Sequence, residues 1–245
     1  LERLVKIPHL RDSIPHPLFY TQMGETFVLG ESFLEGEPII PRMGKDGFPE
    51  QTPAQRHMQS VTEWLISLHH NTAEELTSFP LRQYLETTIK ECIDIYMLDS
   101  FESKILGEMV IQGGLERNIF QFALLHGDFV PHNILVSERP GNLRIGVIDW
   151  ISAERSPFAL FDFFSFCIVY YLHSRKTPGI EGYQEAIRNS FFRENTFSSM
   201  VKRYLKEYCQ EMNIKVSSLR SFLALFLASS AVREYRQVAS LVPYG

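Results

Sequence analysis

The segment LLHGDFVPHNILV at residues 124–136 places polar side chains between two apolar, strand-like runs. Asp128 and Asn133 stand five positions apart in it, and Asp149 follows in the later run VIDW. Carboxylate and carboxamide oxygens are ligands that suit Mg²⁺, which also keeps water and phosphate oxygens. A third carboxylate beside such an ion would be free to handle a proton. Phosphoryl transfer needs this combination, because the metal neutralises phosphate charge while a base takes the hydroxyl proton of the acceptor.

A β-hairpin is the element that would bring these side chains together. NILVS and NLRIGVID, within residues 133–149, are β-like runs joined by ERPGN, whose Pro-Gly pair is a strong turn signal. Antiparallel pairing centred on Gly141 predicts that Asn133 lies opposite Asp149 at the open end of the hairpin. The alternative interpretation is that Asp128, Asn133 and Asp149 are ordinary turn and cap residues.

HGDFVPHN followed by VIDW resembles the catalytic core of the aminoglycoside phosphotransferase and choline kinase superfamily, whose members are related to the protein kinases. The protein-kinase motifs are H-R-D-L-x-x-x-N and D-F-G. Gly127 and Trp150 therefore place this chain on the small-molecule side of that division. The resemblance implies that Asp128 is the catalytic base and that Asn133 and Asp149 bind Mg²⁺.

The same resemblance predicts a nucleotide site for ATP. FVLGESFLEGEPI resembles the last strand and hinge of the nucleotide lobe, with the backbone of Ser32, Phe33 and Leu34 facing the adenine. Leu135 and Ile148 would lie under the adenine ring.

Further positions match the superfamily less specifically. VTEWLISLHH resembles the first long helix of the C-terminal lobe, which often ends in Leu-His, as it does here at His69. Asp162 falls where the superfamily has a structural Asp. We interpret His126 as a scaffold residue of the loop rather than a proton carrier, and His132 as facing solvent or capping the loop. Glu154 is read as an exposed loop carboxylate, with contact to a cationic acceptor as the alternative.

The chain departs from the superfamily before the hinge. Only 25 residues precede TFVLGESF, and they contain no Gly-rich loop and no strand-borne Lys with a Glu partner. Lys6 and Glu2 are not convincing substitutes, and the first 20 residues resemble the end of the lobe's helix and the following loop. Three explanations stay open: the sequence is a piece of a longer chain, as its start at Leu1 suggests, another part of the molecule supplies the lobe, or the domain has lost nucleotide chemistry.

Hydrophobic periodicity predicts the elements that surround the motif. A β-prone run covers 26–34, and a long helix begins with Thr52 as N-cap, Pro53 at its first position and Gln55 completing a capping box. Further helices are predicted at about 81–98, 101–111, 158–173, 181–192, 198–212 and 217–238. The expected fold is α+β and protein-kinase-like: residues 1–35 are a remnant of the N-terminal β lobe and hinge, and residues 36–245 form a mostly helical catalytic lobe with a small β-hairpin.

Composition limits the class of protein. With 245 residues, 44% hydrophobic and 22% charged, the chain is an ordinary globular protein, and its net charge of −5 argues against a nucleic-acid partner. The acidic balance weakly favours a cationic or neutral substrate. Cys92, Cys167 and Cys209 are expected to be buried reduced thiols of a cytoplasmic protein. The most apolar run, at 222–232, is too short to span a membrane.

The sequence therefore supports two functions of different classes. The first is an ATP- and Mg²⁺-dependent phosphotransferase that acts on a hydroxyl of a small molecule, such as an amino sugar, aminoalcohol or sugar, with the acceptor pocket formed partly by the helices beyond residue 170. The second is a kinase-like binding or regulatory domain. A protein kinase is a weaker option, because Trp150 replaces the Phe-Gly pair and no Ala-Pro-Glu segment follows.

Overall fold

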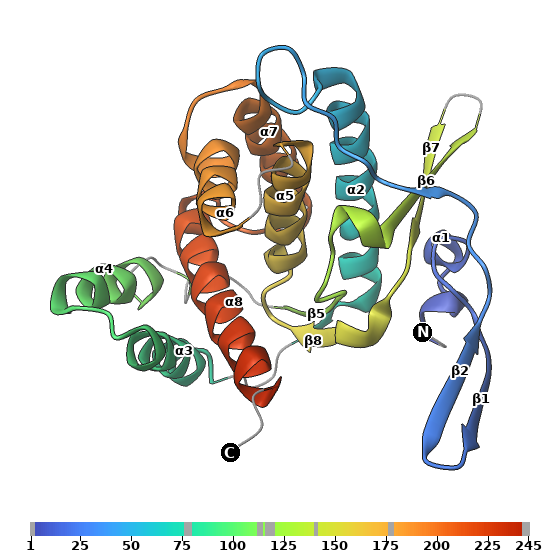
Figure 1. Ribbon diagram of the computed structural model, residues 1–245, viewed down its shortest axis with the longest axis horizontal. Coiled ribbons are helices and arrows are strands. Elements are labelled where there is room, and N and C mark those ends of the chain that lie inside the picture. The colour runs from blue at the N-terminus through green and yellow to red at the C-terminus, as the bar shows by residue number, and fades with distance from the viewer. Residues whose placement is uncertain are drawn as a thin grey trace. The chain divides into compact units, whose positions relative to one another are not determined.

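The computed structural model describes residues 3–75, 80–111, 115, 121–139, 142–175 and 179–241. The chain divides into two compact units (Figure 1). The first consists of Leu1–Ala73 and Ala123–Met212, and the second of Glu74–Phe122 and Asn213–Gly245. This division follows packing within each unit, so the expected lobe boundary at residue 35 stays a prediction.

Short antiparallel strands of the first unit lie around the motif. The strands of two of its sheets are β1 (Pro17–Met23) and β2 (Thr26–Glu31), and β3 (Glu37–Pro38), β6 (Ile134–Arg139) and β7 (Asn142–Val147). The end of β5 (Gln121–Leu125) pairs with β8 (Glu154–Ser156), and its register runs from Ala123 with Ser156 to Leu125 with Glu154. Strand β1 begins inside the first 20 residues, which are expected to form the end of a helix and a loop. It pairs with β2 through a two-residue connection in which Gly24 has a φ of 64°.

Helices form the core of the first unit. They are α1 (Pro8–Arg11), α2 (Gln51–Thr72), α5 (Leu160–Arg175), α6 (Gly179–Ile187) and α7 (Thr196–Glu211), with a π-helical turn at Arg188–Phe192. Helix α2 contacts both α5 and α7. Met58, Val61, Leu65 and Leu68 are fully buried along it, which confirms the predicted periodicity.

The predicted start of α2 is two residues too late. The helix begins at Gln51, and Glu50 is its N-cap with no side-chain capping bond, so Thr52 is not a cap. Pro53 lies inside the first turn, where its missing N–H would have had no intrahelical acceptor in any case. A capping box does occur at α7, where the backbone N–H of Ser198 donates to Asn195 Oδ1 at 2.8 Å.

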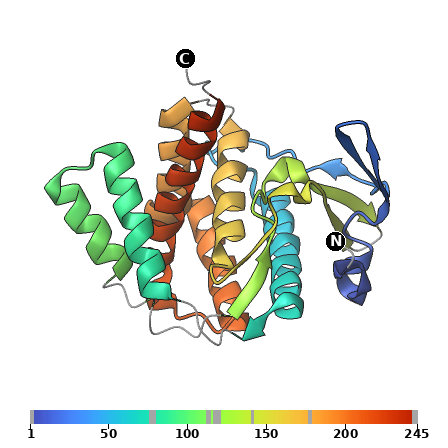
Figure 2. The same ribbon diagram turned by 90° about the horizontal axis from the view of Figure 1, so that it is seen from below.

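The second unit contains α3 (Leu81–Tyr96), α4 (Ser100–Ile111) and α8 (Leu219–Leu241), together with the short strand β4 (Glu74–Glu75). Helices α3 and α4 each contact α8 (Figures 1 and 2). Cys92 packs with Ala228 and Val232 in the small core between α3 and α8. All three cysteines of the chain are free and buried, as expected.

One helical segment in the described part of the chain, Val216–Ala239, has the length and apolar composition of a membrane span. It is longer than the apolar run recognised in the sequence. Half of its most apolar window is buried inside the protein, and a core helix of a soluble protein passes the same test. The segment therefore gives only weak evidence for a membrane location.

Candidate active site

The hairpin that carries the motif forms with a register different from the predicted one. Ile134 pairs with Val147 at one end, and Arg139 pairs with Asn142 at the other. This register differs by one position from pairing centred on Gly141. The predicted Pro-Gly turn itself lies outside the described residues. As a result Asn133 lies opposite Ile148, whose N–H donates to the Asn133 carbonyl at 3.0 Å.

Asp128 and Asn133 are in direct contact. The Asn133 amide nitrogen donates to Asp128 Oδ2 at 2.9 Å and to the Asp128 carbonyl at 3.0 Å. Asn133 ends a 3₁₀ turn, Pro131–Asn133, and its side chain is buried, so its orientation is fixed. Because both hydrogen bonds use the amide nitrogen, the amide oxygen is the end of the side chain left for a cation.

Asp149 is linked to this pair through the backbone, because the residue before it, Ile148, donates its N–H to the Asn133 carbonyl. It follows Ile148 directly, is exposed, and has a left-handed backbone with a φ of 63°. Such a backbone is uncommon for a residue other than Gly and is often found at functional sites. The Trp150 indole N–H donates to the Val147 carbonyl at 3.0 Å and closes the turn that follows the strand.

His126 lies within electrostatic reach of both carboxylates. Burial lowers its pKa, while a hydrogen bond from Nε2 to the Ile148 carbonyl (2.9 Å) and the charges of Asp128 and Asp149 act in the opposite direction. The ring also packs against Trp150, with centroids 4.8 Å apart. These contacts support the scaffold role expected for His126, since they tie the start of the loop to the end of β7.

The side-chain oxygens of Asn133 and Asp149 are of the type that Mg²⁺ prefers. Among the described residues, no three His, Cys, Asp or Glu side chains are grouped to hold a metal ion. In the predicted site, Mg²⁺ would use the amide oxygen of Asn133 and the carboxylate of Asp149, and would complete its shell with water and phosphate oxygens. Few protein oxygens plus water and phosphate is the coordination that Mg²⁺ usually adopts.

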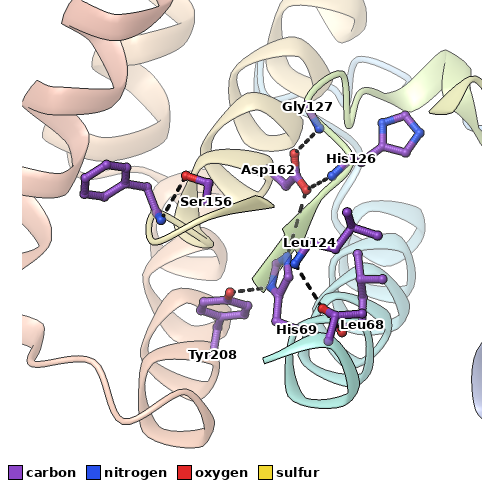
Figure 3. A network of polar contacts seen from close by, with 10 residues as sticks. Leu68, His69, Leu124, His126, Gly127, Ser156, Asp162 and Tyr208 are labelled. Carbon is purple, nitrogen blue, oxygen red and sulfur yellow. Dashed lines mark hydrogen bonds and ion pairs between the residues drawn. The ribbon is translucent and has the colours of Figure 1, made fainter. Parts of the chain in front are cut away.

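Asp162 binds the backbone at the start of the loop that carries Asp128. It lies in the first turn of α5 and is 2% exposed. Its carboxylate accepts the backbone N–H of His126 at 2.7 Å and that of Gly127 at 3.0 Å (Figure 3). These two hydrogen bonds explain how Asp162 can serve the structural role expected for it: its buried carboxylate fixes the two peptide groups that precede Asp128.

Comparison with known proteins decides the fold. Residues 111–194 match the model of the phosphotransferase enzyme family. A glucosamine kinase structure is 15% identical over 99% of this chain and 65% of its own chain, with a TM-score of 0.56. The chain has a protein-kinase-like fold. Both the predicted resemblance and the fold class are confirmed.

Two aminoglycoside phosphotransferase structures are also similar to the chain. A type VIII aminoglycoside-3′-phosphotransferase is 15% identical over 93% of this chain and 78% of its own, with a TM-score of 0.48. A Streptomyces rimosus aminoglycoside phosphotransferase in complex with ADP and streptomycin is 13% identical, covering 93% and 80%, with a TM-score of 0.48. No curated protein sequence matches the chain significantly.

In this kinase-like fold the predicted hinge borders a cleft of about 370 Å³. Its lining combines residues 32–35 with the side of the β6–β7 hairpin and the N-terminal segment, namely Ser137, Arg144, Ile145, Gly146, Arg11, Asp12 and His16. The Ser32 N–H donates a hydrogen bond to the His16 carbonyl at 2.8 Å. Within the described chain, Phe33 and Leu34 form no backbone–backbone hydrogen bond.

The remaining predicted residues are placed as follows. Leu135 is buried in β6 opposite Gly146, and Ile148 is half-buried at the end of the hairpin. Glu154 is exposed on β8. His132 is exposed as expected, and its ring lies 6.0 Å from that of His173.

Sequence reasoning missed Ser13, which ties the N-terminal segment to the site. Its carbonyl accepts the Val147 N–H at 2.7 Å, and its hydroxyl accepts the Trp64 indole N–H at 2.8 Å. A lone Ser in a loop gives no sequence signal for such a role, because both partners are distant in the chain.

Gly127 is expected to tolerate no side chain. Its φ is 78°, and an added Cβ would collide with the carbonyl oxygen of Ser152. Left-handed backbone costs other residues about 1–2 kcal/mol, and overpacking adds about 1–3 kcal/mol. We therefore expect Gly127→Ala to lower the free energy of unfolding by about 3 kcal/mol, measured by urea denaturation.

Gly24→Ala is the matched control for this substitution. Gly24 also has a positive φ, 64°, but nothing lies within 4 Å of an added Cβ. Gly24→Ala should therefore lower the free energy of unfolding only by the backbone cost of about 1–2 kcal/mol. Equal losses for the two variants would show that the Ser152 carbonyl moves aside.

Proposed function

We propose that this protein is an ATP- and Mg²⁺-dependent phosphotransferase that moves the γ-phosphoryl group to a hydroxyl of a small molecule. The observation that carries the proposal is the hydrogen-bonded pair Asp128–Asn133, in which the Asn133 carbonyl also accepts the N–H of Ile148, the residue before Asp149. In the proposed roles Asp128 receives the proton, and Asn133 and Asp149 hold the metal.

The local hydrogen bonds support these roles. Asn133 donates a hydrogen bond to one carboxylate oxygen of Asp128. This bond fixes the plane of the carboxylate and leaves its other oxygen to accept a hydroxyl proton. The bound cation would neutralise charge on the phosphates. Asp162 and His126 supply no chemistry in this scheme. They keep Asp128 from moving, and such positioning is a large part of phosphoryl-transfer catalysis.

The acceptor is proposed to be an amino sugar, an aminoalcohol or a sugar. The similar structures named above include a glucosamine kinase and an aminoglycoside phosphotransferase bound to streptomycin, and the net charge of −5 is compatible with a cationic acceptor. A screen of such hydroxyl compounds with γ-labelled ATP tests this proposal. Label in the acceptor that depends on Asp128 would support it, and ADP release without labelled acceptor would contradict it.

Nucleotide binding can be tested before any acceptor is known. Phe33 and Leu34 are proposed to bind the adenine edge, with Leu135 and Ile148 beneath the ring. At an ATP concentration 100 times its dissociation constant, we expect the free energy of unfolding to rise by about 2.7 kcal/mol in the presence of Mg²⁺. Thermal unfolding with ATP, Mg²⁺, or both measures this.

Asp149→Asn is the informative variant for that measurement. It keeps the shape of the side chain but removes the charge proposed to hold the cation. The stabilisation by ATP should then lose its dependence on Mg²⁺. A variant that still requires Mg²⁺ to the same extent would exclude Asp149 as a metal ligand.

One observation favours a second candidate, a kinase-like binding or regulatory domain. The β1–β2 hairpin exposes apolar side chains on both faces: Tyr20, Phe27 and Leu29 on one, and Phe19 and Met23 on the other, with Leu18 exposed at the register shift between Pro17 and Phe19. A two-stranded hairpin is marginally stable alone, and exposed apolar patches usually mark interaction surfaces. Further strands of a longer chain, or another protein, could cover these faces. Mg²⁺-independent binding of a partner to the hairpin, without phosphotransfer, would favour this candidate.

A further inference from the structure

A buried polar network lies behind the loop that carries Asp128. His69, near the end of α2, is fully buried, and its Nδ1 forms a 2.6 Å hydrogen bond with the hydroxyl of Tyr208 on α7. Its other ring nitrogen, Nε2, lies 4.0 Å from Asp162 Oδ2 (Figure 3). Nε2 is buried and has no hydrogen-bond partner in the described part of the chain. The network thus joins α2 and α7 to the carboxylate that holds the loop.

Burial decides the protonation states of this network. Desolvation lowers the pKa of His69 to about 3, so its ring is neutral near pH 7 and carries a single N–H. The pKa of Tyr208 is raised well above its usual value by burial and by the charge of Asp162, so its hydroxyl keeps its proton. The neutral ring therefore has one donor nitrogen and one acceptor nitrogen.

Two arrangements of the protons satisfy the short bond to Tyr208. In the first, the Tyr208 O–H donates to Nδ1, and the His69 N–H is on Nε2 and faces Asp162. In the second, Nδ1–H donates to the Tyr208 oxygen, and a lone pair on Nε2 faces the buried carboxylate. The second arrangement makes a lone pair on buried Nε2 face a buried carboxylate oxygen, which is repulsive, whereas the first gives a favourable charge–dipole interaction. At 4.0 Å this interaction is electrostatic and not a hydrogen bond.

We propose that Tyr208 is a positioning residue that locks His69 in the Nε2–H form, so that Asp162 is held where it binds the His126 and Gly127 peptides. The chain of contacts then runs from the Tyr208 hydroxyl through the His69 ring and the Asp162 carboxylate to the loop ahead of Asp128. Its catalytic consequence rests on the proposed function, but its structural part does not.

The proton arrangement is tested on the unmodified protein. Two-bond ¹H–¹⁵N spectra of protein labelled with ¹⁵N-histidine distinguish the two neutral tautomers. The His69 signals can be assigned from through-space contacts with the Tyr208 ring. We expect the proton on Nε2. A proton on Nδ1 would overturn the proposal, whatever activity the protein has.

Amide exchange tests the mechanical part of the proposal. Tyr208→Phe removes the hydroxyl and leaves the aromatic ring. We expect hydrogen exchange of the His126 and Gly127 amides to become about tenfold faster, the size expected when one buried hydrogen bond is lost. Unchanged exchange at these two amides would overturn the role given to Tyr208.

Tyr170→Phe is the matched control. Its hydroxyl forms a similar 2.9 Å bond to Nδ1 of His57, whose pKa burial lowers to about 4, but this pair has no contact with Asp162 among the bonds described. It should leave exchange at His126 and Gly127 unchanged. Equal acceleration in both variants would mean a general loss of stability and would overturn the specific link.

Kinetics separate this proposal from the proposed function. Once an acceptor is found, Tyr208→Phe should lower kcat about tenfold and leave the KM for ATP unchanged, because the loop and not the nucleotide site is loosened. A change in KM alone would contradict the link. If no acceptor is phosphorylated, the proposed function fails. The tautomer and exchange measurements still test the link from Tyr208 through His69 to Asp162.

Discussion

Asp128→Asn is expected to lower kcat by about 10²- to 10⁴-fold, the range for loss of a general base, or about 2.7–5.5 kcal/mol in the activation free energy. The substitution removes the proton acceptor but keeps an oxygen that can accept the Asn133 amide bond of 2.9 Å. Loop geometry should therefore survive. The KM for ATP should change little, because Asp128 is not assigned to the nucleotide or the metal. Steady-state kinetics with the acceptor found in the screen provide the measurement.

Asp46→Asn is the control for a general effect of removing a carboxylate. Asp46 is exposed and also accepts hydrogen bonds, one from the Thr196 hydroxyl at 3.0 Å and one from the Phe48 N–H at 3.1 Å. It should retain wild-type turnover. If Asp128→Asn also turns over normally, Asp128 is not the base, and the binding-domain alternative gains support.

The contact between Asp128 and Asn133 could be predicted because it is local. Five residues on one tight loop leave few ways to separate the two side chains, so their types and spacing in the sequence already indicate a shared site. The buried face of α2 was predictable for a similar reason, since a 3.6-residue period directly reflects which side is covered. Patterns of this kind depend only on residues close in the sequence, so they can be read before the fold is known.

The register of the hairpin could not be fixed in the same way. The two strands can be paired about Gly141 alone or about the Pro140-Gly141 pair, and these two registers differ by one position. The sequence around Pro140-Gly141 is compatible with both. Only pairing along the whole hairpin, from Ile134 with Val147 to Arg139 with Asn142, decides between them. The error changed the partner of Asn133 but not the site, because Asp149 still follows the paired residues directly.

Tertiary roles left no trace in the sequence pattern. Tyr208 falls on the apolar side of a helix, where periodicity indicates only a core residue, and nothing local shows that its hydroxyl meets His69. Ser13 is a similar case, because its partners Trp64 and Val147 are far along the chain. Such residues act through contacts that exist only when distant elements pack together.

Asp162→Ala is expected to lower the free energy of unfolding by about 2–6 kcal/mol, because it removes the carboxylate that accepts the buried His126 N–H and the half-buried Gly127 N–H. Each unsatisfied buried group costs about 1–3 kcal/mol. Whole domains have only about 5–15 kcal/mol of stability, so the loss is a large fraction of the total. Urea denaturation measures it, and exchange at the His126 and Gly127 amides shows where it occurs.

Asp99→Ala tests whether burial, and not the number of hydrogen bonds, causes that loss. Asp99 also accepts two backbone N–H groups, from Phe101 and Glu102 at 2.8 Å each, but at an exposed helix start. Water can replace it there, so the cost should be about 1 kcal/mol, as for other N-caps. If Asp162→Ala cost no more than this, water would reach the peptides of the loop. Asp162 could then not be the rigid support that the position of Asp128 requires, since a solvated loop start would move with the solvent.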